Sequence, residues 1–554
     1  MQTASTNPET AVDAAEAWWR GAVVYECHLP SFRDGNGDGI GDLEGLIASL
    51  DYVRGTLGAD AVWTGPFYRS PLLDQGFDVA DHTDIEPIFG DLEIFDRLLV
   101  EAHARGIQVI VDYIPNHTSD QHPWFIDSRS SRTNPKRDWY VWRDPHADGG
   151  PPNNWTSEAG GSVWEWDTGT GQYYLHSHLK EQPDLNWRNP QVRAAMLDVL
   201  RYWLDKGVDG VRIDVAHMLM KDPEFRDNPE AVGGNDNPYD LQHPDFGSQL
   251  HLYDRRHPDT HDALAEIRAV VDEYPGAVTI AEIEAMSWDE WAAYYGPALN
   301  GMHLPFPFRL LETEWQAGRL RNELAGLYAA MPAGGWPIIA LGNHDRLRLA
   351  TRLGAAQARV AAVLMLTVAA TPCLLYGDEL GMTDQPVPAE RQRDHFGHTA
   401  GGVSRDSTRT PMPWSAGYNA GFSSADPAKL WLPLARNSAE INVDAQLADP
   451  SSFLSLYRRL IQVRRASSAL RHGELRFLAD ACTDAVVAYE RYRGADHKAV
   501  LLNLTDSPAR VQLGLTGTVL LSTVGGSGRH VEPEFHLGAG EAVVIDVVER
   551  ARTT

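Results

Sequence analysis

The sequence predicts an α/β protein: a (β/α)8 TIM barrel with a small domain inserted after the third strand and an all-β domain at the C-terminus. Strand-like apolar runs alternate with helical patterns through most of the chain, which is typical of repeated β-α units. The 554 residues exceed what one hydrophobic core fills. After position 470 the pattern changes to short alternating runs, which favours an antiparallel tail domain.

Eight apolar runs are expected to form the barrel strands, which is the number that closes such a barrel. They lie at 23–29, 59–67, 107–114, 208–215, 277–283, 302–308, 337–343 and 371–379. Helices are expected over 93–105 and 189–206, because both end directly before a glycine and the second begins at Asn-Pro.

The remaining segments predict the domain boundaries. We expect the first part of the barrel at 15–114, the inserted domain at 115–188, the second part of the barrel at 189–470 and the all-β domain at 471–554. The insert is too long for an ordinary loop, and a second long loop at 382–437 is expected to rim the site. A helix over 453–470 should precede tail strands at 485–492, 499–504, 510–515, 519–524 and 542–548.

Composition restricts the partners. A formal net charge of -28 disfavours nucleic acids and anionic membranes and favours a neutral substrate. The first twenty residues lack a signal-peptide pattern, and no run is expected to cross a membrane, so a cytoplasmic protein is expected. Cys27, Cys373 and Cys482 are interpreted as structural thiols of a reducing compartment. We expect a monomer or a small homo-oligomer.

Carboxylates and histidines gather where apolar runs end, which in a (β/α)8 barrel is where the active site lies. The segments are DYIPNH at 112–117, QPDLN at 182–186, GVRIDVAH at 210–217, TIAEI at 279–283 and LGNHD at 341–345. Arg212 and Asp214 point to one face of their strand, so the cation should keep the carboxylate ionised. The alternative interpretation is a structural ion pair, with Glu282 a solvated acid at the rim.

These motifs, with DGNGDGIGDL at 34–43, YGDELGM at 376–382 and RTPMPW at 409–414, resemble glycoside hydrolase family 13, the α-amylase family, and its α-glucosidase and oligo-1,6-glucosidase branch. The likeness implies that Asp214 is the nucleophile and Glu282 the acid and base. Asp345 would bind the 2- and 3-hydroxyls of the sugar. Negative charge from Asp214 and Asp345 would help keep Glu282 protonated. Glu284 shares a strand face with Glu282 and is the rival for the acid.

The resemblance also implies a substrate-binding set: Phe77, Asp78, His117, Arg212, His344 and Arg405. His117 and His344 would bind sugar hydroxyls as neutral imidazoles, although a buried structural histidine is the alternative for each. Asp78 matches the acid that grips the non-reducing end in this branch, with Arg405 as its expected partner. Such a pair would close the pocket and make cleavage exo. Phe77 stands where relatives usually have Tyr and keeps a stacking face.

A loop after the first strand alternates oxygen ligands with glycines and resembles half of a calcium-binding hand. Its candidate ligands are Asp34, Asn36, Asp38, Asp42 and the backbone carbonyl of Ile40. The glutamate of a full hand is absent, because position 45 holds glycine. The resemblance implies a structural Ca2+ or Mg2+, and the alternative is a turn rich in Asp and Gly.

The implied function is a retaining exo-α-glucosidase for short α-glucosides such as maltose, isomaltose or sucrose, with some capacity for transfer through a covalent glucosyl-enzyme intermediate. The alternatives are an α-glucosyltransferase or a sucrose- or trehalose-type isomerase, and a non-catalytic sugar-binding or transporter-associated relative. The bond position stays open: Val215 accompanies α-1,6 preference in some relatives, whereas QPDLN is shared by enzymes of several linkages.

Overall fold

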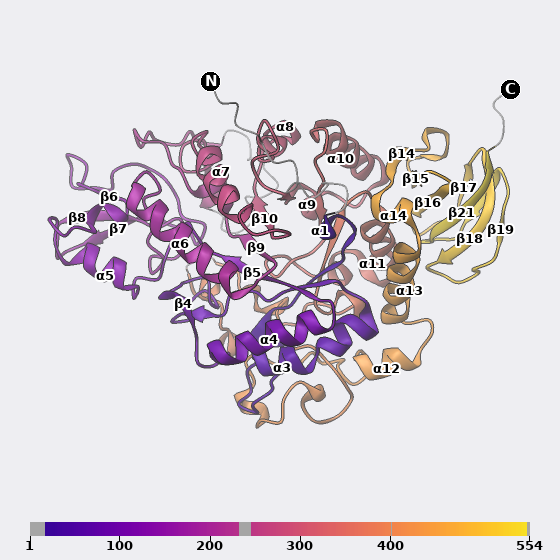
Figure 1. Ribbon diagram of the computed structural model, residues 1–554, viewed down its shortest axis with the longest axis horizontal. Coiled ribbons are helices and arrows are strands. Elements are labelled where there is room, and N and C mark those ends of the chain that lie inside the picture. Colours follow the sequence, from indigo (N-terminus) through magenta and orange to yellow (C-terminus); the bar gives the residue numbers. More distant parts are fainter. Residues whose placement is uncertain (1–16, 232–244, 400–401, 551–554) are drawn as a thin grey trace, which may run out of the picture.

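The computed structural model describes residues 17–231, 245–399 and 402–550 (Figure 1). A parallel barrel occupies the centre, a small sheet lies at one end of the long axis, and the C-terminal sheets lie at the other end. The predicted fold class is confirmed. The domain boundaries stay predictions, and positions 15–16, 232–244, 400–401 and 551–554 of those domains lie outside the described residues.

Each of the eight predicted runs contains one barrel strand. They are β1 (Val24–Glu26), β2 (Ala61–Trp63), β5 (Gln108–Tyr113), β9 (Gly210–Ile213), β10 (Val278–Ile283), β11 (Leu304–Pro307), β12 (Ile338–Ile339) and β13 (Thr371–Leu375). The order β11-β10-β9-β5-β2-β1-β13-β12 is parallel throughout, and β11 packs beside β12, which nearly closes the barrel. All six residues of β10 are buried, as expected of a strand covered on both faces.

The longer helices are α4 (Leu92–Ala104), α6 (Pro190–Lys206), α7 (Thr260–Val271), α10 (Ala317–Ala330), α11 (Leu349–Thr367) and α13 (Phe453–Ala466). Shorter ones are α1 (Trp18–Gly21), α2 (Leu29–Phe32), α3 (Leu43–Ala48), α5 (Pro123–Ser130), α8 (Trp288–Ala293), α9 (Arg309–Glu312), α12 (Val443–Ala448) and α14 (Ser468–His472). Helix α6 has the predicted ends: Asn189 accepts the N–H of Gln191, and Gly207 takes the left-handed conformation at φ 100°.

The prediction of a single helix over 453–470 is wrong, because the structure has two helices, α13 and α14, in this region. Ser467 is extended, with φ -115° and ψ 116°, which ends α13 at Ala466. The Ser467 side chain then accepts the N–H of Leu470 and so caps α14. A serine that satisfies a free N–H group of the next helix favours this break over a continuous helix.

Helix α11 bears on the expectation that no run crosses a membrane, which stays a prediction. Among the described residues it is the one helix long and apolar enough to do so by length and composition, with a mean hydropathy of 1.3. However, 61% of that stretch is buried, and the helix packs against α13 and the tail strands β16 (Asp496–Asn503) and β21 (Ala542–Arg550). Burial between two domains accounts for its apolar composition, and one such helix is weak evidence of a membrane span.

The insert and the tail each build their own sheets. In the insert, β6 (Trp142–Arg143), β8 (Gln172–Leu175) and β7 (Trp164–Asp167) form a three-stranded antiparallel sheet, and β3 (Tyr68–Arg69) pairs with β4 (Asp81–Ile85) before it. In the tail, β14 (Glu474–Phe477), β15 (Val486–Arg493), β16, β21, β18 (Leu515–Ser522) and β19 (His530–Val531) form one sheet. A second pairs β17 (Ala509–Gln512) with β20 (Glu534–Leu537). The tail thus has the predicted β character and a core of its own.

Candidate active site

The three predicted catalytic carboxylates meet in one small cavity at the carboxyl ends of the barrel strands. It has a volume of about 50 Å³. Its lining residues are Asp74, Phe77, His117, Glu158, His178, Asp214, Val215, Glu282, His344, Asp345, Phe396 and Arg405. We call it the inner cavity.

Arg212 connects the carboxylates at the base of the inner cavity. Its guanidinium donates to Asp112 at 2.9 Å, to Asp214 at 2.7 Å and to Glu282 at 2.5 Å, and the arginine is 2% exposed. One positive charge therefore faces three carboxylates. Arg212 therefore holds the side chains of Asp214 and Glu282 close to one another at the base of the inner cavity.

The pKa of Asp214 departs from the expected direction. Burial raises it well above its usual range, Arg212 only partly offsets this, and Glu282 raises it further. The direction is opposite to the one expected from Arg212, because loss of solvent outweighs one shared cation. That Arg212 keeps Asp214 ionised stays a prediction.

The turn after β9 contributes a backbone group to the same cluster. Val215 has φ 35° and ψ 47°, a left-handed conformation that a β-branched residue rarely adopts. In this conformation its N–H donates to Oε2 of Glu282 at 3.1 Å. Strain of this kind is typical of functional sites, where the surrounding structure holds it in place.

Asp345 is surrounded by cations. Arg405 donates to its Oδ1 at 3.0 Å, Arg409 donates to the same atom at 2.7 Å, and His344 Nε2 lies 3.3 Å from Oδ2. Burial alone would raise the pKa of Asp345, but His344, Arg405 and Arg409 hold it well below its usual range. Asp345 therefore stays ionised at neutral pH.

His117 lies in the cavity as an uncharged ring. Its Nε2 is 3.2 Å from the carbonyl of Phe77 and 3.2 Å from the Gln182 amide nitrogen. Burial, aided by the neighbouring His178, lowers the pKa of His117 to about 3. This agrees with the expected neutral imidazole.

His344 differs from His117. Burial lowers its pKa, but the carboxylates of Asp345 and Glu26 raise it, and the balance lies above the usual value. The ring of His344 is therefore easier to protonate than that of His117, and its expected neutral state stays a prediction. The ring of Phe77 stacks on His344 with centroids 5.5 Å apart and planes 12° apart, so His344 covers one of its two faces, and Phe77 also lines the inner cavity.

Asp78 was the predicted partner of Arg405, but the structure has Asp74, earlier in the same loop, in that position. Arg405 pairs with Asp74 at 2.6 Å, and both residues line the inner cavity. Asp78 is fully buried and accepts from Ser70 Oγ and from the backbone N–H groups of Leu73 and Asp74, so it holds the loop that carries Asp74. Asp78 is not among the residues that line either cavity.

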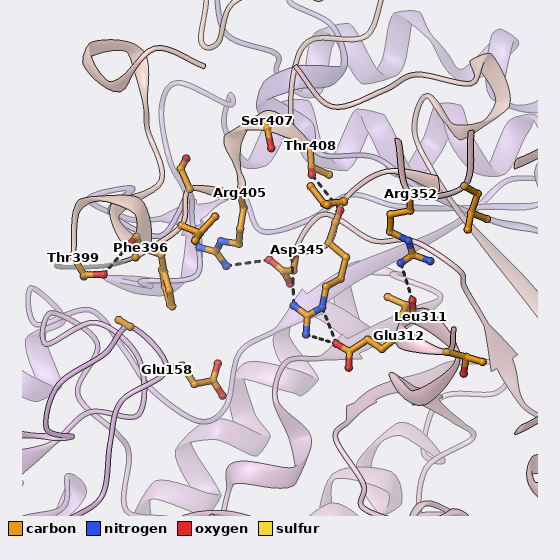
Figure 2. Close-up of a pocket in the computed structure, with 18 of the residues that line it drawn as sticks. Glu158, Leu311, Glu312, Asp345, Arg352, Phe396, Thr399, Arg405, Ser407 and Thr408 are labelled. Carbon is orange, nitrogen blue, oxygen red and sulfur yellow. Dashed lines mark hydrogen bonds and ion pairs between the residues drawn. The ribbon is translucent and has the colours of Figure 1, made fainter. Parts of the chain in front are cut away.

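A larger cavity of about 600 Å³ adjoins the inner one, and we call it the outer cavity. Both are lined by Glu158, Asp345, Phe396 and Arg405. Figure 2 shows Glu158, from the insert, opposite the hydrogen-bonded pair Asp345 and Arg405 from the barrel side. The loop predicted at 382–437 supplies Phe396, Thr408 and other lining residues, as expected of a rim.

Glu158 and His178 are functional candidates that the sequence did not reveal. Glu158 lies 3.5 Å from His178 Nε2 and accepts from Arg255 at 3.0 Å. Both residues belong to the insert, where no strand periodicity indicates which side chains face the barrel. The histidine-rich segment before QPDLN was the one available signal.

Glu284, the alternative candidate for the acid, forms contacts with Arg255 and His217. It accepts from Arg255 at 2.8 Å and lies 3.3 Å from His217 Nε2. Burial would raise the pKa of Glu284, but Arg255 and His217 hold it well below its usual range. Glu284 therefore keeps no proton to donate and does not line the inner cavity, which leaves Glu282 as the candidate acid.

The predicted ion-binding loop is organised by its own backbone. Asp34 accepts from the N–H groups of Asn36, Gly37 and Gly39, and Asp42 accepts from those of Gly35, Asn36 and Gly45. Burial, with a contribution from Asp34, raises the pKa of Asp42 to about 6. Within the described ranges no group of three or more His, Cys, Asp or Glu is arranged to hold a metal ion. The oxygen donors agree with the chemistry of Ca2+ or Mg2+, so the ion stays a prediction.

Comparisons with known proteins extend over nearly the whole chain. Residues 28–473 match the family model for the alpha amylase catalytic domain. A probable alpha-glucosidase of Rhizobium meliloti is 40% identical, with 90% of this chain and 91% of that protein covered. An oligo-1,6-glucosidase of Parageobacillus thermoglucosidasius is 36% identical, with 88% and 91% covered. The crystal structure of an alpha-glucosyl transfer enzyme matches at 38% identity and a TM-score of 0.88, covering 96% of this chain and all of that one.

Proposed function

Because the chain belongs to glycoside hydrolase family 13, the α-amylase family, we propose that it is a retaining, exo-acting α-glucosidase for short α-glucosides such as maltose, isomaltose and sucrose. That it is a glycoside hydrolase follows from the family; the substrate, the exo action and the retention of configuration are our proposal. The observation that carries the proposal is the shared guanidinium of Arg212, which brings Asp214 and Glu282 together in the inner cavity.

The proposed reaction uses these two groups in two steps. Asp214 attacks the anomeric carbon while Glu282 gives its proton to the leaving oxygen, so the glycosidic bond breaks and a glucosyl ester forms. Glu282 then removes a proton from water, the water oxygen attacks the same carbon, and Asp214 leaves as a carboxylate. Two displacements at one carbon retain the α configuration.

Exo action is supported by the ion pair of Asp74 and Arg405. These side chains line the inner cavity on the side of the loop at 70–78, and they would close it there; Arg405 also bonds Asp345 and Asp394. A closed end admits one glucosyl unit, and its charged groups suit the hydroxyls of a non-reducing end. The rest of the substrate would extend into the outer cavity.

Transfer of the glucosyl group to another acceptor, including isomerisation, is the second candidate. Its support is the similarity to an α-glucosyl transfer enzyme and an outer cavity of about 600 Å³, which offers room for an acceptor beside Glu158 and Asp345. Whether water or an alcohol attacks the ester depends on which of them occupies the outer cavity.

We also propose a structural ion, a cellular compartment and an oligomeric state. The loop at 34–42 would hold a structural Ca2+ or Mg2+ through Asp34, Asn36, Asp38, Asp42 and the carbonyl of Ile40. The protein would act in the cytoplasm on a neutral sugar, as a monomer or small homo-oligomer. The odd number of cysteines, all free in the structure, agrees with a reducing compartment.

One experiment tests the proposal. The protein is incubated separately with maltose, isomaltose, sucrose, trehalose and long maltooligosaccharides. NMR identifies the products and shows whether the glucose released first is the α or the β anomer. Release of α-glucose from at least one of these sugars is expected. Release of β-glucose would contradict the double displacement, and attack within long maltooligosaccharides would contradict exo action. A dominant new disaccharide would favour transfer.

A further inference from the structure

Glu26 lies directly behind His344, on the side away from the inner cavity. It ends strand β1, it is 2% exposed, and its Oε1 lies 2.5 Å from His344 Nδ1. The second ring nitrogen of His344, Nε2, lies 3.3 Å from Oδ2 of Asp345. His344 is thus held between two carboxylates, one in the barrel core and one in the cavity.

We propose that Glu26 is a positioning residue that keeps His344 doubly protonated, so that its Nε2–H points at Asp345 and at the hydroxyls of the bound sugar. This inference rests on the proposed glucosidase function, because it assigns a task at the same site. Glu26 itself does not line either cavity, so it would act through His344 alone.

The argument follows from the two nitrogens of the ring. Glu26 has only acceptor oxygens when ionised, so its short contact requires a hydrogen on Nδ1. A neutral ring with Nδ1–H would turn the lone pair of Nε2 toward the ionised oxygen of Asp345, which is repulsive. Adding the second proton converts that repulsion into a charge-assisted contact. The geometry therefore favours imidazolium over either neutral tautomer.

The charges around His344 support the same state. The titratable and charged groups facing it are Glu26 of β1, His28 before α2, Asp112 of β5, and Asp345 and Arg409 from the loops after β12 and β13. Arg409 donates to the His344 carbonyl and opposes the proton, whereas the carboxylates favour it. Burial lowers the pKa of His28 well below its usual value, so that ring adds no positive charge.

Glu26 has little other compensation for its charge. Among the described residues, His344 is its one ion-pair partner, and its Oε2 has no hydrogen-bond partner. A buried carboxylate with a single cationic neighbour is stable only while that neighbour keeps its proton. The edge of Trp63, with ring centroids 5.9 Å apart, and the stacked ring of Phe77 keep solvent from the imidazole.

The test compares the titration of His344 in the wild-type protein and in Glu26→Gln, which preserves shape and an acceptor oxygen but removes the charge. Histidines are labelled with 13C at Cε1, and the His344 signal is identified by its loss in His344→Gln. We expect the pKa of His344 to fall by about one to three units in Glu26→Gln. The alkaline limb of the kcat/KM profile should move to lower pH, with near-normal rates at the acidic end.

Two further variants make the result specific. Glu26→Asp keeps the charge at a longer distance and should restore part of the His344 pKa. Glu490→Gln removes a buried glutamate that contacts His497 at 2.6 Å in the tail domain, and it should leave both the His344 titration and the rate profile unchanged. An unchanged His344 pKa in folded Glu26→Gln would overturn the inference. Wild-type protein that releases no glucose from any α-glucoside would instead overturn the proposed function, and the NMR titration would still report on Glu26.

Discussion

The backbone N–H of Val215 donates to Oε2 of Glu282 across 3.1 Å, so the residue after the candidate nucleophile orients the candidate acid on the next strand. Strands β9 and β10 are neighbours in the barrel, and the left-handed turn at Val215 directs this N–H toward β10. The two groups of the proposed double displacement are therefore coupled by backbone as well as by Arg212.

Glu282→Gln is expected to fold normally and to lower kcat/KM for maltose by roughly 10²–10⁴-fold, since proton donation to the leaving oxygen is lost. An aryl α-glucoside with an activated leaving group needs no such proton in the first step, so its loss of kcat/KM should be much smaller. Steady-state kinetics with both substrates check this. Glu284→Gln is the control and should show no such difference between substrates. Equal losses for the two substrates in Glu282→Gln would argue against its role as the acid.

Asp74→Asn and Asp78→Asn form a matched pair four residues apart. Asp74→Asn weakens a charge-assisted contact at the closed end of the inner cavity, and kcat/KM should fall by about tenfold to a hundredfold with little change in melting temperature. Asp78→Asn replaces one carboxylate oxygen by an NH2 group, which would face the N–H of either Leu73 or Asp74, and this should cost about 1–3 kcal/mol of stability. Thermal melts and kinetics on both variants distinguish these outcomes, and the reverse pattern would restore Asp78 as the substrate ligand.

Two buried histidines predict a loss of stability in acid. Burial lowers the pKa of His82 to about 4 and that of His122 to about 2, and their rings are 5.3 Å apart. Both stay neutral in the fold, whereas the unfolded chain gains protons below pH about 6.5. Each therefore contributes stability that is full above pH about 6.5 and declines by about 1.4 kcal/mol per unit as the pH falls toward its folded pKa.

The variant His82→Phe isolates one of these histidines, because it keeps an aromatic ring and removes the titration. Between pH 7 and pH 5 its melting temperature should fall less than that of the wild-type protein. Parallel curves for the two proteins across this range would show that His82 does not take part in the acid sensitivity.

Removal of a divalent ion tests the loop at 34–42. If Ca2+ or Mg2+ binds there, a chelator should lower the melting temperature by several degrees, since an ion at about 100 times its Kd stabilises the fold by about 2.7 kcal/mol. Adding back each ion separately identifies the one that restores stability. A melting temperature unaffected by the chelator would leave the loop as a turn held by Asp34 and Asp42 alone.

Much of the fold was predictable because apolar runs of strand length are buried on both sides in a parallel barrel. All eight runs held a strand, although β12 keeps only Ile338–Ile339. The break at Ser467 and the burial of α11 were not predictable, because both depend on packing against the tail domain. The tail strands shifted by several residues, as at β18 (Leu515–Ser522), where alternation alone does not fix the register.

The site was predictable where a strand fixes the direction of a side chain. Asp214 and Glu282 emerge from neighbouring strands, so their convergence follows from the barrel. Asp74 and Asp78 lie in a loop with positive φ at Gln75 and Gly76. The sequence alone does not show which of the two carboxylates such a loop directs into the cavity. The charge of His344 also depends on Glu26, which is far away in sequence.

Glu158 lines both the inner and the outer cavity, but it comes from the insert, whereas Asp214 and Glu282 follow strands of the barrel. If the proposed function holds, a substitution at Glu158 would alter how the outer cavity selects between water and an alcohol while leaving the proposed nucleophile and acid in place. The choice of acceptor and the cleavage of the bond would then be set by different parts of one chain.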